Sequence, residues 1–122
     1  MTRRQQVGKA GEEAARSYLE SKGYRIAEAN FRCPYGEIDL VTFDREDLLV
    51  FVEVRTRTGL SFGTPAESIT AGKLKRIQKS ALYYMKGRFQ EEVACRFDLI
   101  AVQMDRKSLS PLDIRHYLSI LD

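Results

Sequence analysis

Two runs of strand-forming residues, adjacent in the chain, do most to limit what it can fold into. Residues 37–43 alternate between polar and apolar side chains, and residues 48–56 are rich in β-branched residues. The polar residues 44–47 between them form only a short loop. The sequence therefore predicts a β-hairpin over residues 37–56.

Periodic patterns on both sides of this hairpin complete one domain over residues 1–122. Helical spacing of apolar residues predicts helices over residues 5–22 and 70–85. Runs of β-branched or alternating residues predict three further strands, over residues 24–30, 93–104 and 112–120. A loop with glycine and proline is expected at 57–67. The order α-β-β-β-α-β-β belongs to the α/β class, with a mixed β-sheet flanked by helices.

Charge is distributed unevenly along the chain. Residues 54–90 hold eight Lys or Arg side chains against the single Glu67, a net charge of +7, whereas the whole chain carries +3. A basic segment suits a polyanionic partner such as nucleic acid, but a solvated face on the 70–85 helix explains the count equally well. In that helix Tyr83 and Tyr84 could stack on a base, although their helical spacing favours core packing.

Several other classes of protein fit the sequence less well. No apolar run approaches the roughly 20 residues of a membrane span, and no apolar stretch follows the basic start. We therefore expect neither a membrane partner nor a secretory signal. Cys33 and Cys95 lack the CxxC spacing of a zinc site and are expected to be reduced thiols of a cytoplasmic protein.

Glu53 is the unusual residue of the second strand, because an apolar run precedes it and Val54 follows it. Burying a carboxylate there is costly unless it is paired or binds a metal. Side chains two residues apart lie on the same face of a strand. Glu53 is therefore on the same face as Arg55, and Asp39 is on the same face as Glu37. Two carboxylates from adjacent strands can bind one Mg²⁺ ion. The alternative, which the spacing alone favours, is an exposed Asp39 or an ion pair across the hairpin.

Four segments together carry a family resemblance. They are Gly8-Lys-Ala-Gly-Glu-Glu-Ala-Ala in the first helix, Gly36-Glu-Ile-Asp-Leu-Val, Val50-Phe-Val-Glu-Val-Arg and Arg96-Phe-Asp. In this combination, from about Gln6 to the last strand, the chain resembles the YraN-like family, also called uncharacterised protein family 0102. That family is similar to the PD-(D/E)xK nucleases and, among them, to archaeal Holliday-junction resolvases. The resemblance implies a restriction-endonuclease-like core.

The resemblance also implies an activity, the metal-dependent hydrolysis of phosphodiester bonds in nucleic acid, with DNA expected and branched DNA included. Asp39 and Glu53 match the two strand positions of the nuclease pattern, Glu12 matches its helix-borne glutamate, and Arg55 completes the catalytic set. One or two Mg²⁺ or Mn²⁺ ions would be held by Asp39 and Glu53, with Glu12 as a further ligand or a ligand through water and the backbone carbonyl of Val54 as an extra oxygen ligand. Resolvases act as dimers, so a homodimer follows by analogy.

Arg55 stands where the nuclease pattern usually has lysine. Arginine stays protonated, so it cannot act as a base, but it can neutralise charge on a phosphate. Lys73 could supply the missing ammonium from another element, although a surface lysine is the preferred interpretation. The basic residues expected to follow a nucleic-acid backbone are Arg57, Lys73, Lys75, Arg76 and Lys79. The alternative function is a nucleic-acid-binding protein that has a nuclease fold and little or no activity.

Two polar residues near the end of the chain are assigned structural roles. His116 has no partner at metal-binding spacing, so we interpret it as a structural histidine. Asp98 is expected to pair with an arginine, either Arg96 or Arg55.

Overall fold

A five-stranded sheet, in the order β1-β2-β3-β4-β5, forms the centre of the protein. The structure is a computed structural model and describes residues 1–59, 69–91 and 93–121, so most of the expected 57–67 loop lies outside the described residues. The elements are α1 Arg3–Ser21, β1 Arg25–Cys33, β2 Gly36–Phe43, β3 Leu49–Thr58, α2 Ala71–Arg88, β4 Cys95–Met104 and β5 Pro111–Tyr117. The predicted order of helices and strands is confirmed.

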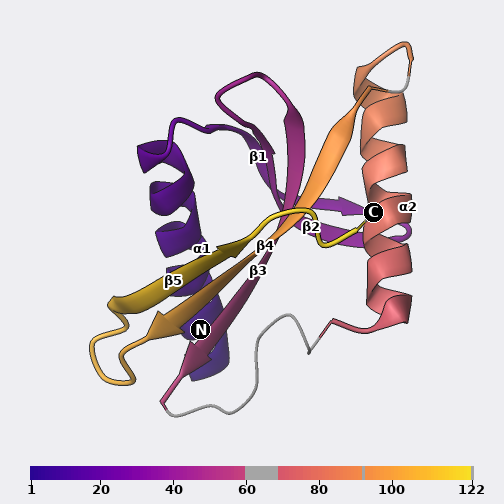
Figure 1. The fold of residues 1–122 in the computed structure, drawn as a ribbon. Coiled ribbons are helices and arrows are strands. Elements are labelled where there is room, and N and C mark those ends of the chain that lie inside the picture. The colour runs from indigo at the N-terminus through magenta and orange to yellow at the C-terminus, as the bar shows by residue number, and fades with distance from the viewer. Residues whose placement is uncertain (60–68, 92, 122) are drawn as a thin grey trace.

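The sheet is mixed, as predicted (Figure 1). β3 and β4 run parallel, whereas the β1–β2, β2–β3 and β4–β5 pairs are antiparallel. Parallel neighbours need a crossover connection, and the segment that contains α2 supplies it. β3 therefore lies in the middle of the sheet, between its hairpin partner and its parallel neighbour.

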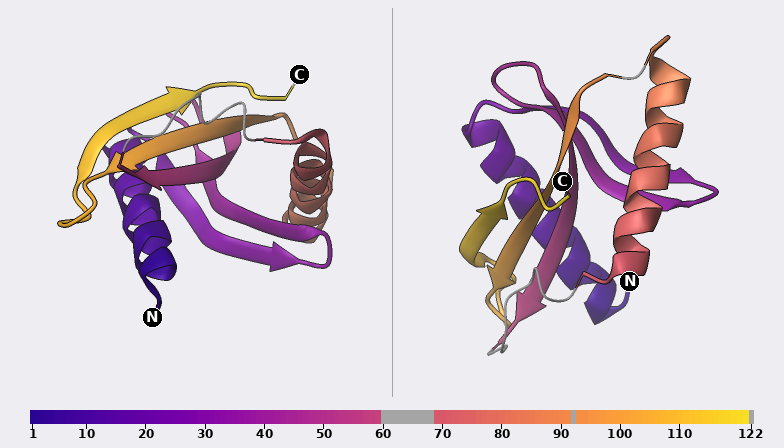
Figure 2. Two further views of the ribbon diagram at one scale, coloured as in Figure 1. Left: turned by 90° about the horizontal axis from the view of Figure 1, so that it is seen from below. Right: turned by 45° about the vertical axis from the view of Figure 1, so that its right-hand side comes forward.

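Both faces of β3 are covered, because α1 and α2 pack on opposite sides of the sheet (Figure 2). Val50 and Val52 belong to the core around α1, whereas Leu49 and Phe51 belong to the core around α2. This arrangement explains why the apolar run of the strand is unbroken up to Glu53. Within the described residues, no helix is long and apolar enough to cross a membrane.

Two strands end at positions that differ from the predictions. β1 continues past Asn30, which adopts a left-handed backbone with φ 55°, a conformation that asparagine tolerates. β5 ends at Tyr117, because the chain then turns and the Ser119 N–H donates a hydrogen bond to Asp98 at 3.0 Å. Both differences arise from local conformations that a periodic pattern does not record.

Gly11 allows α1 to approach the sheet closely. It is buried, and a Cβ at this position would lie 2.6 Å from Cγ2 and 2.7 Å from Cβ of Thr56 on β3. Only glycine fits such a close approach without a shift of the helix or the strand. The same approach brings the next residue, Glu12, close to the sheet.

Gly11→Ala is expected to lower the free energy of unfolding by about 1 to 3 kcal/mol, the usual cost of overpacking. Thr56 is β-branched and stiff, so it cannot rotate away freely. Gly8→Ala is the matched control, because its added Cβ meets nothing within 4 Å, and it should stabilise α1 by up to about 1 kcal/mol. Urea denaturation measures both changes. Equal effects of the two substitutions would contradict the close packing at Gly11.

Candidate active site

The two strands of the hairpin separate at Asp39. Pairing between β2 and β3 extends as far as Leu40 opposite Val52. Immediately beyond that pair, the Oδ2 atom of Asp39 accepts a hydrogen bond from the Val54 N–H at 2.8 Å. A side-chain carboxylate therefore replaces a backbone partner at the fork, which fixes its position relative to both strands.

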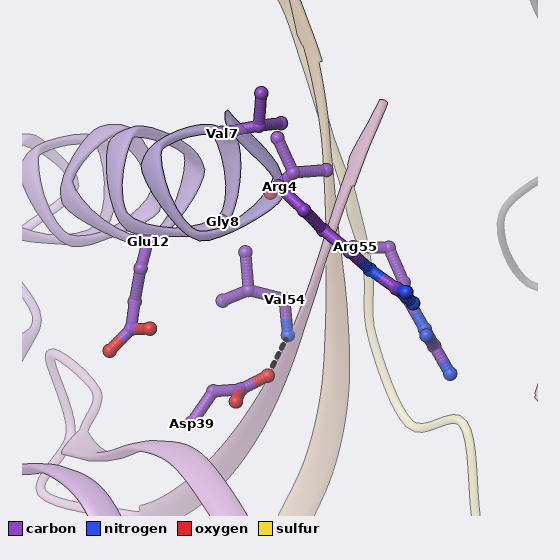
Figure 3. Close-up of a pocket in the computed structure, with 8 residues that line it drawn as sticks. Arg4, Val7, Gly8, Glu12, Asp39, Val54 and Arg55 are labelled. Carbon is purple, nitrogen blue, oxygen red and sulfur yellow. Dashed lines mark hydrogen bonds between the residues drawn. The ribbon is translucent and has the colours of Figure 1, made fainter. Parts of the chain in front are cut away.

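Asp39 lines two pockets, one beside each helix. The first, called here the α1 pocket and drawn in Figure 3, has a volume of about 280 Å³ and is lined by Arg4, Val7, Gly8, Glu12, Asp39, Val54, Arg55 and Thr56. The second, called here the α2 pocket, has a volume of about 180 Å³ and is lined by Gly36, Glu37, Asp39, Glu53, Lys73, Arg76 and Ile77. Asp39 therefore connects the acidic residue of α1 with those of the hairpin.

Helix α1 directs Glu12 into the α1 pocket. Glu12 is half-buried and lines the pocket, whereas Glu13 is exposed. Burial raises the pKa of Glu12, and a hydrogen bond with the Asn30 side chain opposes that increase. Figure 3 shows the carboxylates of Glu12 and Asp39 on the same side of the pocket, with Arg4 extending away from them. The structure thus brings the helix-borne glutamate to the strand acid.

The sequence pattern did not identify Asn30 or Arg4 as members of the site. An asparagine inside a strand run is a signal for a left-handed backbone, and Asn30 adopts one. Arg4 is one of several basic residues near the start of the chain, and its spacing does not distinguish it from the others.

Glu53 is only 9% exposed and lies beside two cations. The Nζ atom of Lys73 is 2.9 Å from Glu53 Oε1, and the Nε atom of Arg55 is 3.8 Å from the same oxygen. Lys73 stands in the first turn of α2, where the capping residue Thr70 accepts a hydrogen bond from the Lys73 N–H at 3.2 Å. The interpretation of Lys73 as a surface lysine is therefore wrong, because its ammonium lies at the acidic site.

Arg55 lies near Glu53, as strand alternation predicted. Its Nε atom is buried and has no hydrogen-bond partner within the described part of the chain. The side chain is 29% exposed and lines the α1 pocket. A guanidinium group in this position can bind an anion that enters the pocket.

Electrostatic repulsion is concentrated at Asp39. Burial and, after it, the carboxylates of Glu53, Glu12 and Glu37 together raise the pKa of Asp39 to about 7, although the hydrogen bond from Val54 acts to lower it. Like charges that share a site disfavour ionisation of one another. A bound cation would relieve this repulsion.

The donor atoms at this site suit a hard divalent cation. Asp39, Glu53 and Glu12 offer only oxygen atoms, which Mg²⁺ and Mn²⁺ prefer. Among the described residues, no three acidic, histidine or cysteine side chains are close enough together to hold one ion. Mg²⁺ often uses only one or two carboxylates and completes its shell with waters and substrate phosphates. The assignment of these three acids and the Val54 carbonyl as metal ligands stays a prediction.

The predicted nucleic-acid-binding residues occupy different places. Arg76 lines the α2 pocket together with Lys73, and Lys79 is exposed farther along the same helix. Lys75 is also exposed, and neither Lys75 nor Arg57 lines either of the two pockets. The basic residues of α2 therefore begin at the acidic site and continue away from it.

Asp98 and His116 form a separate, buried network. Asp98 is fully buried, accepts a hydrogen bond from Arg96 Nε at 2.9 Å and lies 2.8 Å from His116 Nε2. Burial acts to raise the pKa of Asp98, but the hydrogen bonds with His116 and Arg96 outweigh it and lower that pKa. Arg96 is therefore a partner of Asp98, and these contacts join β4 to β5.

Asp39→Asn is expected to stabilise the metal-free protein by about 1 to 3 kcal/mol above about pH 7. The pKa of about 7 in the folded protein lies above the value of about 3.9 for an unfolded aspartate, so the wild type loses stability as pH rises through this window. Asparagine removes the charge and can still accept the Val54 N–H.

Urea denaturation in EDTA at about pH 8 and about pH 4 measures the effect of this substitution. Glu13→Gln, which removes an exposed carboxylate from α1, is the control and should change stability little at either pH. A stability gain of equal size at both pH values would contradict the electrostatic explanation.

Comparison with known proteins identifies the family. The sequence model of Uncharacterised protein family UPF0102 matches residues 11–102. A UPF0102 protein from Moorella thermoacetica is 49% identical over 107 residues, which cover 88% of each chain. A relative from Pelotomaculum thermopropionicum is 50% identical over 104 residues, which cover 85% of this chain and 86% of the relative. A relative from Chlorobaculum tepidum is 42% identical over 115 residues, which cover 92% of this chain and 88% of the relative. These matches confirm the YraN-like resemblance, and the chain belongs to uncharacterised protein family UPF0102.

Proposed function

We propose that this protein is a metal-dependent nuclease that hydrolyses phosphodiester bonds in nucleic acid, with DNA, including branched DNA, as the expected substrate. One observation carries the proposal. Glu12 of α1 and Glu53 of β3 both lie near Asp39 of β2, and Lys73 and Arg55 lie beside Glu53. The resemblance to PD-(D/E)xK nucleases supports the same assignment.

Each residue has a defined task in this proposal. Asp39 and Glu53 would bind Mg²⁺ or Mn²⁺ together with the Val54 carbonyl, and Glu12 would bind the ion through a water. When bound, the metal lowers the pKa of water and stabilises the leaving oxygen of the phosphodiester. Arg55 neutralises the charge that develops on the phosphate, a task that does not require it to lose its proton.

Lys73 has two successive tasks in this proposal. In the metal-free protein its ammonium balances the charge of Glu53. When a cation takes over that role, the ammonium is free to contact the substrate phosphate. Lys73 thus supplies, from α2, the positive charge that the nuclease pattern usually places at position 55.

Lys73→Gln is expected to bind Mn²⁺ about three- to tenfold more tightly than the wild type, because one positive charge beside Glu53 is gone. Cleavage should nevertheless fall by about 10- to 100-fold, because the ammonium no longer contacts the phosphate. Metal titration and cleavage rates measure the two effects. Lys86→Gln, which changes an exposed lysine near the other end of the same helix, is the matched control and should change neither. Weaker Mn²⁺ binding in Lys73→Gln would rule out the first task, and unchanged cleavage would rule out the second.

The alternative function is nucleic-acid binding with little or no catalysis, and Arg55 in place of lysine is the feature that favours it. A pure binder gains nothing from half-buried carboxylates beside a phosphate path, because they repel the phosphates. Lys73 also supplies an ammonium at the site. For these reasons we favour the nuclease.

A cleavage panel tests the proposal. Linear duplex, flapped and four-way DNA are each incubated with Mg²⁺ or Mn²⁺, and the wild type is compared with a folded Asp39→Asn variant. We expect strand cleavage by the wild type, none in EDTA, and none by the variant. Binding of these DNAs by the wild type without cleavage would instead support the alternative function.

A further inference from the structure

Two exposed tyrosines lie side by side near the α2 pocket. Tyr35 is in the turn between β1 and β2, Tyr83 is on α2, and they are 48% and 47% exposed. Their ring centres are 6.2 Å apart, with the ring planes at 69°. Figure 2 shows this turn lying beside α2. The pair therefore presents an aromatic surface that the fold does not bury.

Core packing explains Tyr84 but does not explain Tyr83. Tyr84 is only 5% exposed, and its ring centre is 5.8 Å from that of Phe51 in the core. Tyr83 is 47% exposed, and its ring contacts within the described residues are with the half-buried Phe31, at 6.3 Å, and with Tyr35. The core-packing interpretation is therefore wrong for Tyr83.

Positive charge lies beside the tyrosine pair. The Nζ atom of Lys79 is 5.9 Å from the centre of the Tyr35 ring. Arg76 lies about one helical turn before Lys79 and lines the α2 pocket with Lys73. These three cations span about 9 Å of helix, at about 1.5 Å per residue. The tyrosine pair is thus connected to the acidic site by a row of cations suited to a short run of phosphates.

We propose that Tyr35 and Tyr83 stack against an unpaired base of the substrate, while Lys79 and Arg76 bind the flanking phosphates. This inference rests on the proposed nuclease function and narrows its substrate to nucleic acid with an unpaired nucleotide near the scissile phosphate. Single strands, flaps and open branch points provide such a nucleotide. A base inside a duplex is stacked on both faces, so it cannot offer a face to the tyrosines.

The positive charge beside the tyrosine pair favours a nucleic-acid ligand over a protein partner. The centres of protein–protein interfaces are depleted in lysine, whereas proteins that bind single-stranded nucleic acid combine exposed aromatic rings with a cationic groove. The arrangement of Tyr35, Lys79 and Tyr83 matches the second case.

Fluorescence anisotropy in EDTA tests the proposal in the absence of metal-dependent cleavage. The probes are a labelled oligothymidine of about 12 nucleotides and a blunt duplex of about 20 base pairs. Tyr35→Ala/Tyr83→Ala should weaken oligothymidine binding by about tenfold or more and duplex binding by less than about twofold. Tyr35→Phe/Tyr83→Phe keeps both rings and should bind both probes like the wild type.

Leu82→Ala is the control for loss of exposed apolar surface, because Leu82 is 39% exposed and precedes Tyr83 on α2. It should bind oligothymidine like the wild type. The proposal is overturned by a wild type that does not bind oligothymidine, by unchanged binding in the alanine variant, by a loss of binding in the phenylalanine variant, or by equal losses on both probes. Since no cleavage is measured, a failed stacking test leaves the nuclease proposal intact, and an inactive enzyme leaves the binding comparison valid.

Discussion

A folded Glu53→Gln protein is expected to lose cleavage by at least about 10³-fold, because a bound metal contributes several kcal/mol to the transition state and each 1.4 kcal/mol is about tenfold in rate. Glutamine keeps the size of the side chain and one carbonyl oxygen, but it removes the charge that holds a divalent cation. It also leaves the Lys73 ammonium without the carboxylate that lies 2.9 Å away. Single-turnover rates with Mn²⁺, expressed per folded molecule, measure the loss.

Glu37→Gln is the matched control for this prediction. Glu37 lines the same α2 pocket and adds to the repulsion at Asp39, but its side chain is 41% exposed and pairs with Arg32 at 3.7 Å. Cleavage should stay within about threefold, because an exposed ion pair contributes little. Equal losses in the two variants would show that the charge of the pocket controls the rate, whichever carboxylate provides it.

Arg55→Gln is expected to lower cleavage by about 10²- to 10³-fold, the usual cost of removing one preorganised donor from a developing oxyanion. Arg55→Lys should stay within about tenfold of the wild type, because the charge remains and only the forked geometry is lost. The Arg55 side chain is 29% exposed and lines the α1 pocket, where its guanidinium can reach a phosphate. Its Nε atom has no hydrogen-bond partner among the described residues and is 3.8 Å from Glu53 Oε1.

A purely structural role for Arg55 leads to a different expected result. If Arg55 only braces β3 against Glu53, Arg55→Gln lowers stability while each folded molecule cuts at the wild-type rate. Urea denaturation gives the folded fraction, and the cleavage rate divided by that fraction separates the two roles. A folded Arg55→Gln protein that cuts as fast as the wild type would exclude Arg55 from the site.

Most of the fold could be predicted, because its elements carry strong periodic patterns. The apolar stripe of α2 and the β-branched run of β3 each specify one type of element, and all seven elements appear in the predicted order. The predictions ended the first strand at Asn30 and the last at Ile120, whereas these strands end at Cys33 and Tyr117. Asn30 has a left-handed backbone inside β1, and the Ser119 N–H donates a hydrogen bond to Asp98 just after β5 ends. Neither feature has a periodic signature.

Less of the site could be predicted, because contacts between distant elements create it. Strand alternation placed Glu53 beside Arg55, and the family resemblance selected Asp39. The contact of Lys73 with Glu53 depends on where α2 crosses the sheet, and spacing along the chain does not determine that crossing. The same reason applies to Tyr83, because helical spacing does not show where the edge of the core lies.

The central claim is that Asp39 and the carboxylates around it form a metal site. Isothermal titration calorimetry of Mn²⁺ binding to the metal-free protein tests this claim most directly. We predict that the wild type binds Mn²⁺ and that Asp39→Asn/Glu53→Gln loses at least about tenfold in affinity, because both charged ligands are removed. Glu13→Gln, the exposed neighbour of Glu12, should bind like the wild type. A double variant that binds Mn²⁺ as tightly as the wild type would contradict the account.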